Sequence, residues 1–337
     1  MPALLEIKDL FVSFHTFSGE VEAVRGVSLS LRPGEVLAIV GESGCGKSVL
    51  CRSVMKLLPQ NGWIKGGTIL ADGIDITNYT QRDMERLRGR LFSMVFQDPL
   101  TALNPTMTVG AQIAEAVQIH QPGLKKAAVR CRALELMDLV DIAGGEERYG
   151  RYPHDFSGGM RQRAVMAAAL ASNPKILFAD EPTTALDVTI QAQILDLLRD
   201  IQVKMGTATV LVTHDLGVVA RAADRVAVMY AGKIVETGTV EDIFYAPQHP
   251  YTWGLLRALP SRAVVGEPLY TIPGMPPTLI NPPKGDAFAC RNEYALAIDY
   301  QEPPPMFQIS ETHFAATWLL DKRAPKIMPP LGGSYHE

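Results

Sequence analysis

The sequence predicts an α/β fold built on a mainly parallel sheet with helices on both faces. Three short apolar runs carry this prediction: residues 35–40, 175–180 and 208–213 read EVLAIV, KILFAD and ATVLVT. Each run has the length and the continuous apolar character of a strand that is buried on both faces. Stretches with helical spacing of apolar residues alternate with these runs, and that alternation is typical of a parallel sheet covered by helices.

The remaining elements follow in chain order. Residues 3–31 alternate apolar and polar side chains around HTFSGE (15–20), which predicts two antiparallel strands joined by a turn. Residues 107–149 show helical periodicity and little strand signal, so we expect a helical insertion there. Residues 225–238 resemble a hairpin that turns at Ala231-Gly232. Near residue 259 the composition changes, and the many prolines beyond it predict a small, irregular C-terminal appendage.

Composition narrows the possible functions. A chain of 337 residues suits one large domain with an appendage, or two domains. The net charge of −4 provides no basic field for nucleic acid or for an anionic membrane surface. No apolar run reaches the roughly 20 residues that span a bilayer, and the first residues lack a secretory signal pattern. The four cysteines have no CxxC spacing, so we expect free thiols in a reducing cytosol.

The segment GESGCGKS (41–48) fits the phosphate-binding pattern G-x-x-x-x-G-K-[ST] and lies between a predicted strand and a predicted helix. Gly41, Gly44 and Gly46 let the backbone curl so that its amides face phosphates. Lys47 supplies a positive charge for the terminal phosphates, and Ser48 offers an oxygen to Mg²⁺. The alternative, a glycine-rich turn with an exposed lysine, is the weaker interpretation.

Polar residues follow other predicted strands. Asp180 ends the run at 175–180 and Glu181 follows it, at the strand end where ligands of open α/β sheets bind. Asp180 is a candidate Mg²⁺ ligand, and Glu181 a candidate base that orients or deprotonates the attacking water. His214, which follows the run at 208–213, is a candidate γ-phosphate contact. Gln97, at a predicted strand-to-loop junction, is a candidate contact of the metal or the water. Each residue type in isolation is more often a cap or a packed side chain.

A second candidate anion site lies at DFSGGMRQR (155–163). Ser157 is a candidate helix cap, and Gly158 and Gly159 would let another molecule approach the exposed amides at that helix start. One chain would then carry two phosphate sites more than a hundred residues apart.

Together these motifs resemble the ATP-binding cassette (ABC) ATPase family over roughly residues 3–258. GESGCGKS resembles its Walker A loop, FQDP its Q-loop, FSGGM its signature, ILFADE its Walker B motif, TALD its D-loop and LVTHD its H-loop. The resemblance implies ATP and Mg²⁺ as cofactors, with Ser43, Cys45 and Val49 of the loop also at the nucleotide. It implies an aromatic residue stacked on adenine, for which Phe14 and Phe17 are both candidates. Met160 departs from the commonest signature, which has glutamine there.

The resemblance also explains the two phosphate sites. In this family two ATPase domains bind two nucleotides head to tail, so Ser157, Gly158 and Gly159 would close over the ATP of a second, homologous ATPase. Asp187 of the D-loop would lie at the same nucleotide. The resemblance further implies two integral membrane permease subunits, an indirect extracellular peptide-binding protein, no nucleic acid, and a peripheral place on the cytoplasmic face of the membrane.

The C-terminal segment indicates which transporters are involved. PQHPYTWGLLRALP (247–260) resembles the extension of oligopeptide, dipeptide and nickel importer ATPases, and as an amphipathic helix it should pack on the main domain. Many members continue with four cysteines that hold an iron–sulfur cluster. At those positions this chain has Asp286, Asn292, Asp299 and Thr317, and Cys290 is out of register, so we expect no cluster. Asp286, Asp299 and His313 could form a replacement metal site, but solvated loop side chains are the favoured interpretation.

The resemblance is strongest to cluster-free oligopeptide permeases of Gram-positive bacteria. We therefore predict an ATP-hydrolysing subunit of an oligopeptide importer, with residues 1–258 as the nucleotide-binding domain, a helical subdomain at about 100–165 and an extension at 259–337. An importer of dipeptides or nickel is the alternative. A non-transport ABC ATPase is less favoured because the chain lacks a second cassette and is acidic, and Glu181 and His214 argue against a module that binds without hydrolysis.

Overall fold

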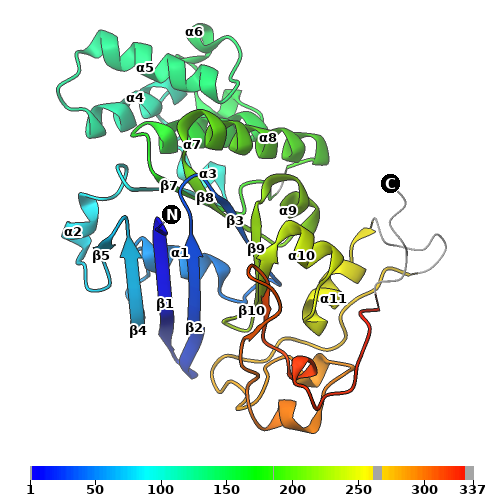
Figure 1. Cartoon of the computed structure of the whole chain (residues 1–337). Helices are drawn as coiled ribbons and strands as arrows, with labels where there is room; N and C mark the ends of the chain where they lie inside the picture. Colours follow the sequence, from blue (N-terminus) through cyan, green and yellow to red (C-terminus); the bar gives the residue numbers. More distant parts are fainter. Residues whose placement is uncertain (1, 185, 261–267, 331–337) are drawn as a thin grey trace. The chain divides into compact units, whose positions relative to one another are not determined.

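The computed structural model describes residues 2–184, 186–260 and 268–330. Figure 1 shows its helices and strands, coloured along the sequence. The chain divides into two compact units that interleave along the sequence. The first unit comprises Met1–Leu5, Leu31–Val36 and Ala71–Val212. The second comprises Glu6–Ser30, Leu37–Leu70 and Thr213–Glu337. Each unit combines strands and helices, which confirms the predicted α/β class.

Three parallel strands of the first unit are neighbours in a sheet. They are β6 (Phe92–Val95), β7 (Ile176–Asp180) and β8 (Ala208–Thr213), with β7 in the middle. Every residue of β7 and β8 is buried, as expected for strands covered on both faces. The bounds of β7 and β8 agree with the predicted apolar runs to within a residue. A short strand, β5 (Ile74–Asp75), and a one-turn helix, α2 (Gln81–Glu85), precede β6.

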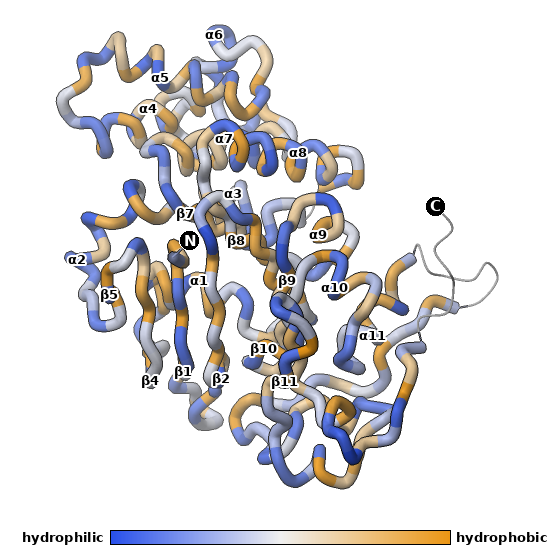
Figure 2. Tube along the Cα trace, in the orientation of Figure 1, coloured by the Kyte–Doolittle hydropathy of each residue, from blue (hydrophilic) through white to orange (hydrophobic). Residues whose placement is uncertain are grey.

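The predicted helical insertion is present in the first unit. Its helices are α3 (Pro99–Ala102), α4 (Val109–His120), α5 (Lys126–Leu139), α6 (Gly145–Arg148) and α7 (Gly158–Leu170). The 3₁₀ turn η1 (Pro153–Asp155) leads into α7, which packs against α3, α4, α5 and β6. Figure 2 shows hydrophobic and hydrophilic residues alternating along these helices, as in helices with one buried face. The long α8 (Val188–Met205) ends at Gly206 in the left-handed conformation.

The second unit contains the predicted N-terminal hairpin. β1 (Leu5–Thr16) and β2 (Gly19–Leu31) are neighbours in a sheet and are joined by a two-residue turn. β4 (Gly62–Ala71) lies on the other side of β1. The sequence analysis did not identify β4, because its half-exposed residues and four glycine and lysine positions give a weak strand pattern.

The second unit also contains β9 (Arg225–Tyr230), which pairs in parallel with β3 (Val36–Val40) and antiparallel with β10 (Lys233–Thr239). The β9–β10 turn has positive φ at Ala231 (46°) and Gly232 (82°), which confirms the predicted hairpin. The helices of the unit are α1 (Lys47–Val54), α9 (Leu216–Ala222), α10 (Val240–Tyr245) and α11 (Pro250–Arg257). Among the described residues, no helix combines the length and apolar character needed to cross a membrane.

The C-terminal extension has little regular structure, as predicted, but it is well packed. Its elements are η3 (Ala289–Arg291), η4 (Ala297–Tyr300), β11 (Phe307–Gln308), β12 (Phe314–Ala315) and η5 (Trp318–Leu320). β12 pairs with the edge of β10, with Glu236 opposite Ala315, and β11 pairs with β12. Phe288 joins a core cluster with Tyr230 and Tyr251, so α11 packs inward as expected.

One expectation for the extension is wrong. Asp286, Asp299 and His313 are not solvated loop side chains, because their exposed fractions are 9%, 2% and 2%. The sequence analysis treated a proline-rich, irregular segment as exposed. Here the backbone turns bury polar side chains that hydrogen-bond to them, as described below.

Candidate nucleotide-binding site

The loop that leads from β3 into α1 is tightly fitted to its surroundings. Gly41, Gly44 and Gly46 have φ of 151°, 79° and 107°, values that side chains rarely adopt. A Cβ on Gly41 would lie 2.1 Å from the carbonyl oxygen of Met229, and one on Gly46 would lie 2.4 Å from that of Ala23. Both positions therefore require glycine, and the loop keeps the curled form that phosphate-binding amides need.

The lysine of this loop is enclosed by the loop itself. Lys47 is 5% exposed, and its Nζ donates to the carbonyl oxygens of Gly41 (2.7 Å) and Glu42 (2.9 Å). Cys45 is also buried, and burial raises the pKa of its thiol despite the nearby ammonium of Lys47. Ser43 and Gly44 are exposed, whereas Ser48 and Val49 are half-buried. A buried ammonium beside exposed loop residues fits the binding of a phosphate chain.

At the end of β7, the predicted site residues Gln97 and Glu181 are in contact. Asp180 is fully buried, and Glu181 follows it with a positive φ of 48°. The Oε2 atom of Glu181 accepts hydrogen bonds from Gln97 Nε2 at 3.1 Å and from Thr184 Oγ1 at 2.8 Å. Its backbone N–H donates to Val212 at 2.9 Å. A left-handed non-glycine residue costs about 1–3 kcal/mol, so the surroundings hold this carboxylate in an otherwise unfavourable conformation.

Three of the predicted site residues carry oxygen atoms of the kind that bind magnesium ions. Ser48 supplies a hydroxyl, Asp180 a carboxylate and Gln97 an amide oxygen, and Mg²⁺ prefers such hard oxygen ligands. His214 follows β8 directly and is exposed.

The two aromatic candidates differ in their surroundings. Phe14 is half-buried, and its ring packs so closely on Gly62 that a Cβ there would lie 2.6 Å from the ring. Phe17 lies in the β1–β2 turn and is fully exposed. On the same strand as Phe14, His15 stacks on Trp63 with ring centroids 4.0 Å apart.

The second candidate anion site is a capped helix start. Ser157 is the N-cap of α7, and its Oγ accepts from the N–H of Met160 at 3.4 Å, which confirms the predicted cap. Ser157 and Gly158 are exposed. Gly159 is buried, and a Cβ there would lie 2.5 Å from Ile190 of α8. Asp187 caps α8 by accepting from Ile190 N–H at 2.9 Å and is exposed as well.

The four polar residues at the cysteine positions have a shared structural role. Each side chain accepts a backbone N–H from a nearby residue of its own turn: Asp286 from Phe288 (3.0 Å), Asn292 from Tyr294 (2.9 Å), Asp299 from Leu296 (2.6 Å) and Thr317 from Leu319 (3.3 Å). These bonds hold the irregular backbone where regular secondary structure is absent. Among the described residues, no group of three or more His, Cys, Asp or Glu side chains is arranged to hold a metal ion.

Two residues that contact the phosphate loop were not identified from the sequence. Tyr251 and Arg291 both bond to Glu42, the second residue of the loop. For Tyr251, the sequence predicted only that its segment forms an amphipathic helix. For Arg291, the sequence contains no pattern that links position 291 to position 42.

Comparisons with known proteins agree with this geometry. Residues 24–184 match the family described as ABC transporter, and residues 235–298 match the family described as oligopeptide/dipeptide transporter, C-terminal region. A dimeric structure of the ATP-binding cassette MJ0796 in a post-hydrolysis state with ADP and Pi aligns with a TM-score of 0.63 and 26% identity, over 70% of this chain and 98% of that one. The cbiO1 structure from Clostridium perfringens aligns with a TM-score of 0.64 and 28% identity, over 73% and 92%. The fold and the phosphate loop thus define an ABC ATPase cassette.

Curated relatives narrow the class further. The oligopeptide transport ATP-binding protein OppD of Bacillus subtilis is 58% identical over 97% of this chain and 92% of its own length. The dipeptide transport ATP-binding protein DppD of Lactococcus lactis is 56% identical over 97% and 93%. This chain belongs to the ABC transporter ATPase family, in the branch that carries the oligopeptide/dipeptide transporter C-terminal region.

Proposed function

We propose that this chain hydrolyses ATP to energise a membrane importer of oligopeptides. The observation that carries the hydrolytic part is the hydrogen bond from Gln97 to Glu181 at 3.1 Å, which orients a carboxylate at the end of a buried strand. The transport part rests on the relatives, of which OppD of Bacillus subtilis is named for oligopeptide transport.

In this proposal the phosphate loop binds the nucleotide. The loop amides at Gly41, Gly44 and Gly46, together with Ser43, Cys45 and Val49, surround the phosphates. Lys47 exchanges its contacts with the Gly41 and Glu42 carbonyls for phosphate oxygens. Phe14 and Phe17 remain the two candidates for stacking on adenine. The full exposure of Phe17 supports it, because the ring of Phe14 already packs on Gly62.

The proposed catalytic residues act on the attacking water and the γ-phosphate. Glu181 accepts the water's proton or orients it, with Gln97 fixing the carboxylate. His214 contacts the γ-phosphate. Ser48, Gln97 and Asp180 are the proposed ligands of Mg²⁺, which supplies neutralising charge to the phosphates when it is bound.

We further propose that hydrolysis takes place in a pair of ATPase subunits, with a distinct homologue as the partner. The exposure of Ser157 and Gly158 at the start of α7 supports this, because a helix N-terminus open to another molecule is a ready anion site. The dimeric form of the MJ0796 cassette is a precedent within the fold. Asp187 would lie at the same shared nucleotide.

The same proposal places the chain at the cytoplasmic face of the membrane, bound to two integral permease subunits. An extracellular binding protein would select the peptide. Dipeptides are the alternative substrate, because DppD of Lactococcus lactis is nearly as similar to this chain as OppD. We predict no iron–sulfur cluster, since the four cysteine positions hold Asp286, Asn292, Asp299 and Thr317.

The substrate is tested in the native host with Lys47→Ala and uptake of a labelled oligopeptide, a dipeptide and Ni²⁺ measured in parallel. Loss of oligopeptide uptake alone is the expected result. Loss of dipeptide or Ni²⁺ uptake instead would mean that this solute, and not an oligopeptide, is the substrate. Unchanged uptake of all three would contradict a role in the import of these solutes.

A further inference from the structure

The C-terminal extension makes an ion pair with the phosphate loop. Arg291 Nη1 lies 2.6 Å from Glu42 Oε2, and Arg291 Nη2 lies 2.9 Å from Glu42 Oε1, although 249 positions separate the two residues. The pair is bidentate, with both guanidinium branches on one carboxylate. The Arg291 side chain is 4% exposed and that of Glu42 is 27% exposed. Bidentate pairs of this kind fix geometry as well as charge.

Other contacts keep the guanidinium in place. Arg291 Nε donates to the carbonyl oxygen of Pro273 at 2.8 Å, and Nη1 also reaches the hydroxyl of Tyr230 at 3.3 Å. The group lies within 6 Å of the ring centroids of Tyr230 and Phe288. Burial opposes the charge on Arg291, but the bonds to Glu42 and Tyr230 outweigh it and raise the arginine pKa. Arg291 is therefore a rigid, permanently charged partner for Glu42.

The backbone of Glu42 is held as well. Its N–H donates to the hydroxyl of Tyr251 at 2.8 Å, and Tyr251 is fully buried against Tyr230 and Phe288. The carbonyl oxygen of Glu42 accepts from Lys47 Nζ. Glu42 thus connects α11 and the extension to the lysine of the phosphate loop, through its side chain and through its backbone.

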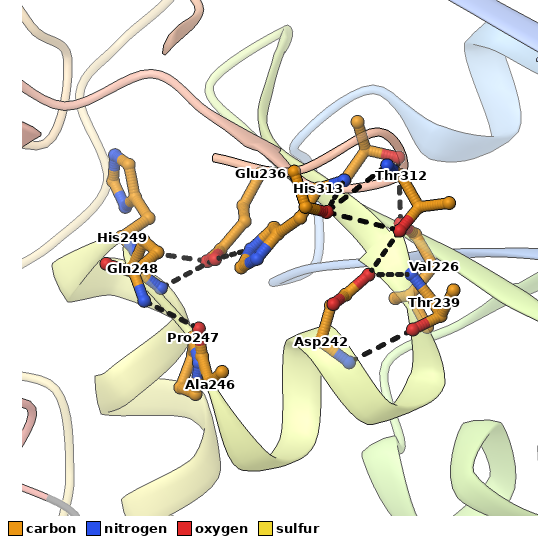
Figure 3. A network of polar contacts seen from close by, with 12 residues as sticks. Val226, Glu236, Thr239, Asp242, Ala246, Pro247, Gln248, His249, Thr312 and His313 are labelled. Atoms are coloured by element: carbon orange, nitrogen blue, oxygen red, sulfur yellow. Dashed lines mark hydrogen bonds and ion pairs between the residues drawn. The ribbon is translucent and has the colours of Figure 1, made fainter. Parts of the chain in front are cut away.

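The extension that carries Arg291 is itself anchored to β10 and α11, as Figure 3 shows. Glu236 of β10 is fully buried, and its Oε1 lies 2.8 Å from His313 Nε2. The same carboxylate accepts the backbone N–H groups of Gln248 (2.6 Å) and His249 (3.1 Å) at the start of α11. Thr312 adds a bond to Asp242 of α10 at 3.0 Å. These contacts hold the part of the extension around Thr312 and His313 on β10 and α10.

The charge of Glu42 is the reason that this anchoring matters. Glu42 places a carboxylate in the loop that would receive the negative phosphates of ATP. An unpaired carboxylate there would repel the nucleotide and would be free to draw Lys47 away from it. Arg291 cancels that charge and fixes its position.

We propose that Arg291 is a positioning residue for nucleotide binding, which acts through Glu42 so that the C-terminal extension sets the affinity of the phosphate loop for ATP. This inference depends on one part of the proposed function, namely that GESGCGKS (41–48) binds ATP. It assigns the extension a role beyond packing.

The test measures binding of ATP with Mg²⁺ to the purified full-length chain by calorimetry. Arg291→Ala should weaken binding at least tenfold. Adding Glu42→Gln to that variant should recover most of the loss, because the unpaired charge is gone. Arg323→Ala is the matched control: Arg323 makes a bidentate pair with Asp321 at 2.8 and 3.0 Å, but on the surface of the extension. It should bind ATP as the parent chain does.

A purely structural role would give a different result. If Arg291→Ala lowers the melting temperature and Glu42→Gln restores no binding, the extension acts by general stability and the proposal is wrong. Equal affinities of Arg291→Ala and the parent chain would also overturn it. Failure of the parent chain itself to bind ATP would instead contradict the proposed function. In the assembled transporter, Arg291→Ala should raise the KM for ATP and leave kcat within about twofold.

Discussion

Gln97 and Glu181, 84 positions apart in the sequence, share a hydrogen bond of 3.1 Å between Gln97 Nε2 and Glu181 Oε2. Thr184 donates to the same oxygen at 2.8 Å. The amide and the hydroxyl together hold one oxygen of this carboxylate in place. A carboxylate held in this way suits the proposed role of Glu181 as the base that orients the attacking water.

Glu181→Gln keeps the size of this side chain and removes its basicity. We expect ATP turnover by the assembled transporter to fall at least 100-fold, since general base catalysis contributes about 10²–10⁴ in rate. Binding of ATP should persist, so the paired ATPase domains should accumulate as a closed dimer on size-exclusion chromatography with ATP and Mg²⁺. Glu147→Gln, on the exposed α6, is the control and should behave as the parent chain. Turnover at the parental rate would show that Glu181 is not the base.

Asp286 should make the chain less stable as the pH rises. Burial, with a contribution from the neighbouring Asp299, raises the pKa of Asp286 to about 6. The folded state therefore holds a proton between pH 4 and 6 that the unfolded state has released, and the free energy of unfolding falls across this window. Asp286→Asn cannot ionise, and its amide oxygen can still accept the Phe288 N–H. We expect it to be more stable than the parent above pH 7, by about 2–3 kcal/mol in urea titrations.

Asp321→Asn is the control for the stability measurement on Asp286→Asn, because the pKa of Asp321 is shifted in the opposite direction. The hydrogen bonds and charge of Arg323 lower the pKa of Asp321 to about 2. Its contribution is present above pH 4 and is lost as the pH falls toward 2, so the substitution should not stabilise the chain at pH 7. A gain at pH 7 from both substitutions would mean that the effect of Asp286→Asn does not come from burial.

His249 should make the chain less stable as the pH falls, the opposite of the effect of Asp286. Complete burial lowers its pKa to about 3, and its Nδ1 accepts the N–H of Tyr251 at 3.0 Å. The unfolded state takes up a proton near pH 6.5 that the folded state refuses, so stability falls as the pH falls toward 3, by at most about 1.4 kcal/mol per pH unit. His249→Asn offers a similar acceptor without titrating. Its stability should therefore change less than that of the parent between pH 6 and 4, and an equal slope for the two proteins would refute the assignment.

The buried pair of Glu236 and His313 should stabilise the docked extension. Removing one partner of a buried hydrogen bond typically costs about 1–3 kcal/mol, and Glu236 keeps its two backbone donors. His313→Ala should therefore lower the free energy of unfolding strongly, while His313→Gln, which retains a hydrogen-bond donor, should lose less. Limited proteolysis should then cleave the alanine variant first within the extension. Equal stability of His313→Ala and the parent would show that the pair contributes nothing.

The sequence predicted the fold well where local patterns suffice. The buried strands at 176–180 and 208–213, the turn at Ala231-Gly232 and the cap at Ser157 all follow from short-range periodicity and turn chemistry. The site was predicted motif by motif, but the contact from Gln97 to Glu181 depends on how distant strands pair. The pairing of Arg291 with Glu42 and the burial of Asp286 gave no signal, because they arise where an irregular segment folds against a sheet edge. From sequence alone, polar residues in such a segment are expected to be solvated. Their burial can be predicted only when the backbone turns to which they hydrogen-bond are known.

In the proposed function, Ser157 of this chain would act at the nucleotide of a partner ATPase. It is tested in an assembled transporter where this chain carries Lys47→Ala, so that the only intact phosphate loop belongs to the partner. Adding Ser157→Arg to this chain should then reduce the remaining ATP turnover at least 100-fold. Thr80→Arg, which removes the comparable cap of α2, should leave it unchanged. Turnover that survives Ser157→Arg undiminished would contradict a shared site.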